Sequence, residues 1–97
     1  MGEKRFKVVF SPAAGRDIER ISIGRALQVV RDIKNYLEST PFPFGKTRTK
    51  KLTGFSPSLY RLRSGNYRAY YRISGNEVII LAVTDKKDSE KLLKNIR

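Results

Sequence analysis

Two copies of the tripeptide Ser-Gly-Asn, at residues 64–66 and 74–76, divide the second half of this chain into three short segments. The segments are LYRLR, YRAYYRI and EVIILAVT, and together they are rich in aromatic and β-branched residues, which favour strands. A Gly-Asn pair between two such segments is typical of the tight turn of a β-hairpin. The sequence therefore predicts a meander of three antiparallel strands, which restricts the chain to folds built around such a sheet.

The first half of the chain predicts one more strand and two helices. Residues 5–10, RFKVVF, place their apolar side chains alternately, as a half-buried strand does. Ser11 followed by Pro12 is a typical helix start, with a capping hydroxyl before a proline in the first turn. A short first helix follows, and after the break at residues 22–24 a longer second helix begins at Arg25. We expect these two helices to form a hairpin.

The second helix has a broad apolar stripe, which predicts that one side of it packs on the sheet. The stripe comprises Ala26, Val30, Ile33 and Leu37, flanked by Leu27, Val29 and Tyr36. The side chains expected to face away from the sheet are Arg31, Asp32, Lys34 and Glu38.

The remaining segments complete the predicted fold. Residues 46–58, KTRTKKLTGFSPS, are polar and basic and are expected to form a connection, and residues 85–97 supply a short terminal helix. We therefore predict a single α+β domain over residues 1–97. It consists of an N-terminal strand, a helical hairpin packed on one face of a mainly antiparallel four-stranded sheet, and a short C-terminal helix.

The charge of the chain indicates an anionic partner. There are 21 Lys and Arg against 9 Asp and Glu, and residues 39–76 contain no acidic side chain at all. A field of one sign favours polyanions or an acidic protein. The chain has no Cys and no His, so thiolate and imidazole ligands are absent, and we predict neither a metal nor another cofactor. No apolar run approaches the roughly 20 residues of a membrane span. We therefore expect a cytoplasmic protein without a membrane partner.

Strand alternation predicts where the arginines gather. Arg61 and Arg63 fall on one side of their strand, and Arg68, Tyr70 and Arg72 share one side of the next strand. Guanidinium groups bind phosphates through paired hydrogen bonds, and a tyrosine among them can stack on an unpaired base, which is typical of single-stranded RNA binding. Protection of an exposed sheet edge explains one or two of these arginines, but not an acid-free stretch of this length. The remaining candidate RNA-binding residues are Lys46, Arg48, Lys50 and Lys51.

Three motifs resemble one family of proteins. They are KKLTG, the segment YRLRSGNYRAYYRI, and VIILAVTDKKDSE, and with the order of elements they resemble the RelE/ParE superfamily of toxins from type II toxin–antitoxin operons. The resemblance covers nearly the whole chain and implies a RelE-like fold. It implies one of two activities. RelE-branch toxins are ribosome-dependent endoribonucleases, or mRNA interferases, that inhibit translation and arrest growth. ParE-branch toxins keep the fold but inhibit DNA gyrase and cleave no RNA.

The resemblance also implies roles for individual residues. Arg68 matches the family arginine that contacts the scissile phosphate, and Arg61 and Arg63 match two basic positions on the preceding strand. Lys86 matches a basic position after the last strand. Leu92 stands where many RelE enzymes have a catalytic tyrosine, so Tyr70 becomes the candidate substitute acid.

Metal-independent cleavage of RNA by its own 2′-hydroxyl needs a base, cations that stabilise the charged intermediate, and an acid for the leaving oxygen. Arginine stays protonated in proteins and so supplies only the cations. The candidate bases are Lys50, Lys51 and Lys86, because a lysine crowded by like charges gives up its proton more readily.

Two alternatives to cleavage stay open: a ParE-like inhibitor of gyrase and a catalytically degenerate RelE-fold binding module. The resemblance implies a cognate antitoxin from the same operon as the partner in every case. It further implies the ribosome and mRNA as targets for an endoribonuclease, with DNA contacted only through the antitoxin.

Overall fold

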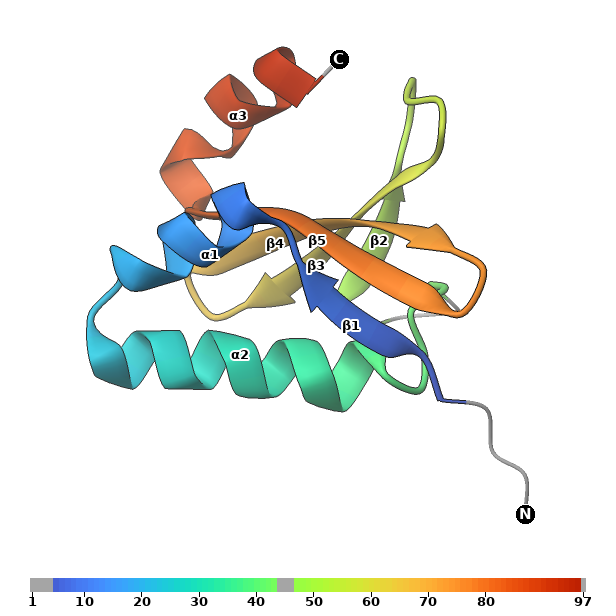
Figure 1. Cartoon of the computed structure of the whole chain (residues 1–97). Coiled ribbons are helices and arrows are strands. Elements are labelled where there is room, and N and C mark those ends of the chain that lie inside the picture. The colour runs from blue at the N-terminus through green and yellow to red at the C-terminus, as the bar shows by residue number, and fades with distance from the viewer. Residues whose placement is uncertain (1–4, 44–46, 97) are drawn as a thin grey trace.

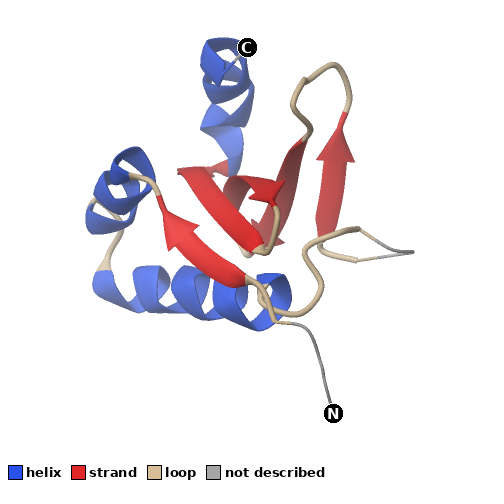
Figure 2. Ribbon diagram, turned by 45° about the vertical axis from the view of Figure 1, so that its right-hand side comes forward, coloured by secondary structure: helices blue, strands red, loops and turns tan. Residues whose placement is uncertain are grey.

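The computed structural model describes residues 5–43 and 47–96, which form one sheet with helices on both of its faces (Figures 1 and 2). The strands are β1 (Lys7–Phe10), β2 (Thr49–Leu52), β3 (Leu59–Ser64), β4 (Tyr67–Ser74) and β5 (Glu77–Asp85). The helices are α1 (Pro12–Glu19), α2 (Ile23–Leu37) and α3 (Ser89–Ile96), and a single 3₁₀ turn, η1 (Lys86–Asp88), precedes α3. Within the described ranges, no helix is both long and apolar enough to cross a membrane.

The sheet has the order β1-β5-β4-β3-β2, with β1 parallel to β5 and all other neighbours antiparallel. The predicted meander is confirmed, because β3, β4 and β5 are joined by the two Ser-Gly-Asn turns. Gly65 and Gly75 have φ values of 57° and 60°, which a residue with a side chain adopts only at a cost. These two glycines therefore make both hairpins possible.

The predicted strand count was wrong by one. Thr49–Leu52 forms β2, an edge strand paired with β3, inside the segment expected to be a connection. Two of its four residues are lysines, which are common on exposed edges but weaken the sequence signal for a strand. The pairing is decided by the neighbouring strand, which would otherwise present unpaired backbone groups.

The helix start at Ser11 is confirmed. Its hydroxyl accepts a hydrogen bond from the Ala14 amide at 3.1 Å and donates one to the Leu81 carbonyl at 3.1 Å. Leu81 lies at a register shift in the β4–β5 pairing, where the ladder skips from Ala82 to Ile80. The cap therefore also attaches α1 to the irregular point of β5. α2 begins at Ile23, two residues before the predicted start.

The core lies between α1, α2 and one face of the sheet. It contains Val29, Ile33 and Leu37 from α2, together with Tyr60 and Tyr71 from the sheet, whose rings stack at 5.4 Å between centroids. The Tyr71 hydroxyl donates to the Pro41 carbonyl at 2.7 Å, and burial raises the pKa of that hydroxyl well above its ordinary value. The core therefore joins the end of α2 to the middle of the sheet.

Candidate functional site

The predicted arginines lie on the sheet face opposite α1 and α2, which we call the arginine face. Tyr71 and Leu62 belong to the core on the helix side, so alternation along β3 and β4 directs the intervening side chains to the other face. Those side chains are Arg61, Arg63, Arg68, Tyr70 and Arg72. The predicted division of these strands into an apolar and a basic side is therefore confirmed by the buried core.

Cross-strand pairing brings three of these arginines together. Arg63 is the direct partner of Arg68, and Arg61 lies two residues before Arg63 on the same face of β3. We call Arg61, Arg63 and Arg68 the arginine cluster. Lys50 of β2 is the direct partner of Arg61, so it extends the row of positive charge to the edge of the sheet.

The positive charges of the cluster act on one another. Burial lowers the pKa of Arg68, and the positive charges of Arg61 and Arg63 lower it further, whereas Tyr70 acts in the opposite direction. Across the described residues, neither ion pair involves a member of the cluster, since they join Arg5 to Glu38 and Arg48 to Asp32. An anion bound at the cluster would relieve this repulsion.

The β3–β4 turn holds Arg68 in place. Its Nη1 donates to the Gly65 carbonyl at 3.1 Å and to the Tyr67 carbonyl at 3.0 Å. The guanidinium is thus directed back over the turn that Gly65 makes possible. An arginine held in this way loses less side-chain entropy when it binds a ligand.

Lys86 lies beside the same turn. Its backbone amide donates to the Asn66 carbonyl at 2.8 Å, and Lys86 lines a cavity of about 490 Å³ with Asn66, Asp85 and Lys87. The structure therefore brings this lysine, from the end of β5, to the turn that Arg68 contacts. Lys87 is a further lysine at this cavity that the sequence analysis did not select.

Leu92, in α3, stands at the position where the resemblance implied a tyrosine. It lines a cavity of about 260 Å³ with Thr84, and Thr84 is the direct cross-strand partner of Arg68. α3 therefore stands over part of the arginine face, which is less open than the sequence analysis expected (Figure 1). An aliphatic side chain there supplies no proton.

Tyr70 was predicted as a base-stacking residue, and its burial contradicts that role in this conformation. The residue is 0 % exposed, so its ring cannot contact a base in solution. Its hydroxyl has no hydrogen-bond partner among the described residues, and the same holds for Arg61 Nε and Arg72 Nε, which are also buried. An unsatisfied buried donor of this kind costs about 1–3 kcal/mol.

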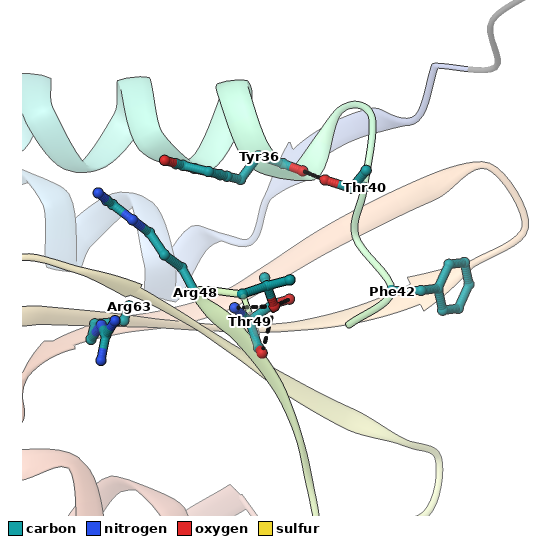
Figure 3. Close-up of a pocket in the computed structure, with 7 residues that line it drawn as sticks. Tyr36, Thr40, Phe42, Arg48, Thr49 and Arg63 are labelled. Carbon is teal, nitrogen blue, oxygen red and sulfur yellow. Dashed lines mark hydrogen bonds between the residues drawn. The ribbon is translucent and has the colours of Figure 1, made fainter. Parts of the chain in front are cut away.

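Arg48 and Lys51 are not part of the arginine cluster. Figure 3 shows Arg48 reaching toward α2, where its guanidinium lies 3.6 Å from Asp32 Oδ2 and 5.1 Å from the centre of the Tyr36 ring. It borders a cavity of about 560 Å³ at the end of α2. Lys51 pairs with Tyr60, whose side chain faces the helices. The predicted RNA-binding residue Lys46 lies outside the described residues.

The sequence analysis placed Asp32 on the outer side of α2, and this was wrong. Asp32 is only 6 % exposed and accepts hydrogen bonds from the Ser64 hydroxyl at 2.6 Å and from Gln28 Nε2 at 3.1 Å. Ser64 follows Arg63 at the end of β3, and the Arg63 amide donates to the Arg48 carbonyl at 2.9 Å. Asp32 thus fixes the strand end that carries Arg63. Its position directly before Ile33, inside the apolar stripe, was the available signal.

The described residues include no group of three or more Asp or Glu side chains that could hold a metal ion. The arrangement as a whole favours a polyanion: a cluster of three arginines, flanked by Lys50 on one side and Lys86 on the other.

Residues 8–90 match the family described as the ParE toxin of type II toxin–antitoxin system, parDE. The chain belongs to this toxin family. It is therefore a type II toxin of the RelE/ParE superfamily, as the resemblance implied. No curated protein matches its sequence.

Solved structures of toxin–antitoxin complexes share the fold of this toxin. The RelBE complex of Mycobacterium tuberculosis is 26% identical with a TM-score of 0.73, and the match covers 90% of this chain and 98% of that one. The RelE–RelB complex of Pyrococcus horikoshii is 22% identical with a TM-score of 0.69, over 84% and 96% of the two chains. The RelB–RelE complex of Methanococcus jannaschii is 20% identical with a TM-score of 0.67, over 87% and 96%. These similarities confirm the predicted RelE-like fold.

Proposed function

We propose that this toxin is a ribosome-dependent endoribonuclease that cuts mRNA in the cytoplasm and so inhibits translation. The observation that carries the proposal is the arginine cluster, three arginines at neighbouring positions on one face of β3 and β4, without an ion pair to any described carboxylate. Closely spaced cations of this kind stabilise the charge that develops on a phosphate under attack. The similarity to the RelBE complex of Mycobacterium tuberculosis, at 26% identity, favours the RelE branch, for which the resemblance implied this activity.

The proposed reaction is an attack of the RNA 2′-hydroxyl on the adjacent phosphate, without a metal ion. Arg68, held by the β3–β4 turn, binds the scissile phosphate, and Arg61 and Arg63 stabilise its added negative charge. Lys50 and Lys86 lie on opposite sides of the cluster and are the candidates for the group that removes the 2′-hydroxyl proton. Tyr70 would serve as acid only after an opening of the site, because its hydroxyl is buried.

A toeprinting assay on translating ribosomes tests this proposal. The wild-type toxin should cut the message at the ribosome, and Arg68→Ala should lower the rate about 10²- to 10³-fold, the usual cost of one such donor. Arg31→Ala is the matched control, because Arg31 is an exposed arginine on α2, outside the cluster. It should cut at the wild-type rate. An intact message with the wild-type toxin, beside an active reference nuclease, would refute the proposal.

A second candidate function is inhibition of DNA gyrase. It is favoured by the match to the ParE family and by Leu92, which leaves the site without the tyrosine of many RelE enzymes. Expression of the toxin would then arrest growth with intact message and induce the DNA-damage response. Purified gyrase would lose supercoiling activity in its presence. A degenerate binding module would show neither effect.

We further propose that a cognate antitoxin from the same operon binds this toxin. The formal net charge of +12 favours a partner with a negatively charged toxin-binding segment, and the structural neighbours were solved as toxin–antitoxin complexes. Contact with DNA would come through the antitoxin. Purification from the native host should recover this protein, and raising the salt concentration should slow association. Recovery of the toxin alone would count against the partner.

A further inference from the structure

Three buried polar atoms on the arginine face, beside the groups proposed to act in cleavage, have no hydrogen-bond partner among the described residues. They are Arg61 Nε, the Tyr70 hydroxyl and Arg72 Nε. Arg61 is the direct cross-strand partner of Tyr70, and Arg72 lies two residues after Tyr70 on the same face of β4. The three unsatisfied groups are therefore neighbours.

The chemistry of these atoms specifies what would satisfy them. Arginine Nε only donates hydrogen bonds, and a tyrosine hydroxyl donates one. The group that accepts from all three must be rich in oxygen, and the two guanidinium charges require it to be negative. Tyr70 is 0 % exposed, whereas Arg61 and Arg72 are half-buried and are the members of this group that solvent reaches. A phosphate group has the required charge and acceptors.

This phosphate would differ from the one at Arg68. Arg72 follows Arg68 by four residues on β4, a separation of about 13 Å at a strand rise of roughly 3.3 Å. The Arg68 guanidinium also donates a hydrogen bond to the Gly65 carbonyl, in the turn that precedes β4 and away from Arg72. One phosphate cannot satisfy both ends of the strand.

Space for a chain that continues past Arg72 is present. A groove of about 520 Å³ separates the β2–β3 loop from α3, and Leu52, Phe55 and Leu93 line it. Leu52 pairs with Leu59, the residue before Tyr60, and Tyr60 pairs with Tyr71, the neighbour of Arg72. The groove therefore lies on the same face of the sheet as Arg72, at a distance of two strands.

We infer that Arg72, Arg61 and the Tyr70 hydroxyl bind a second phosphate of the RNA backbone, one that flanks the phosphate cut at Arg68. This inference rests on the proposed endoribonuclease function. Tyr70 is then a phosphate-binding residue: its hydroxyl is buried in the free protein and becomes accessible when Arg61 and Arg72 move to bind the phosphate. Arg72 positions the message and takes no part in the bond changes, whereas Arg61 lies between the two phosphates and also stabilises the one that is cut.

The test measures binding of a six-nucleotide 2′-O-methyl RNA, which lacks the attacking hydroxyl, by fluorescence anisotropy at several salt concentrations. Arg72→Ala should lower the magnitude of the slope of log K against log salt by about 0.7, the contribution of one single-strand phosphate contact. The control Arg31→Ala should leave the slope unchanged. In the ribosomal assay, Arg72→Ala should raise the toxin concentration for half-maximal cleavage without lowering the maximal rate.

Tyr70→Phe separates this binding role from a structural one. Removal of an unsatisfied buried hydroxyl should leave the Tm of the free protein unchanged or raise it, yet weaken RNA binding about tenfold or more, the loss of one hydrogen bond to a charged group. A lower Tm with unchanged RNA affinity would overturn the inference. Equal salt slopes for Arg72→Ala and Arg31→Ala, with wild-type cleavage intact, would overturn it while the proposed function stands. A wild-type protein that neither binds nor cuts RNA would overturn both.

Discussion

The buried carboxylate of Asp32 provides a quantitative test of how the cluster is held. Asp32→Ala removes the 2.6 Å hydrogen bond from Ser64 and leaves that buried hydroxyl without its partner. A hydrogen bond to a charged group is worth about 1.5–3 kcal/mol. The ion pair with Arg48 is long at 3.6 Å and its arginine is 44% exposed, so it adds less than about 1 kcal/mol. When the hydrogen bond from Gln28 is included, Asp32→Ala should lower the free energy of unfolding by about 3 kcal/mol.

Thermal unfolding followed by circular dichroism measures this loss. For a chain of 97 residues, about 3 kcal/mol corresponds to a fall in Tm of roughly 15 °C. Glu38→Ala is the matched control, because Glu38 makes an ion pair with Arg5 at the shorter distance of 3.3 Å, but on the surface. It should lower the Tm by less than about 5 °C, since exposed pairs contribute little.

A double-mutant cycle with Ser64→Ala identifies the partner. If Asp32 acts mainly through Ser64, the double variant should be more stable than the sum of the single losses predicts, by about 1–2 kcal/mol. Equal effects of Asp32→Ala and Glu38→Ala, or strict additivity in the cycle, would refute the reasoning that burial makes the Asp32 interactions strong.

Three further predictions concern the cap, the turns and pH. Ser11→Ala should cost about 1 kcal/mol and lower the Tm by roughly 5 °C, because α1 loses its cap. Gly65→Ala and Gly75→Ala should each lower the free energy of unfolding by about 1–2 kcal/mol, seen as a lower Tm, since both φ values are positive. Only Gly65→Ala should also slow message cleavage, because Arg68 donates a hydrogen bond to that turn. Burial raises the pKa of Tyr71, so the unfolded chain loses the hydroxyl proton at a lower pH than the folded protein does. Chemical denaturation should therefore show the free energy of unfolding falling above about pH 10, by up to about 1.4 kcal/mol per pH unit. Tyr71→Phe should remove that component, and an unchanged slope would contradict it.

Local signals in the sequence determined most of the framework. The two Ser-Gly-Asn turns and the Ser11-Pro12 helix start were predicted correctly, because each depends on the backbone chemistry of a few adjacent residues. The separation of Arg68 and Tyr70 from Ala69 and Tyr71 followed from the alternation of a strand, which is also a local property.

Contacts between distant segments were decided only by the tertiary structure. β2 forms because β3 lies beside it, and Asp32 is buried because Ser64, 32 residues away, supplies a hydroxyl at the right place. Tyr70 was placed on the correct face, but its burial could not be predicted, since burial depends on what else covers that face. Sequence periodicity gives the direction of a side chain, whereas its partners and its access to solvent depend on which remote segments pack around it.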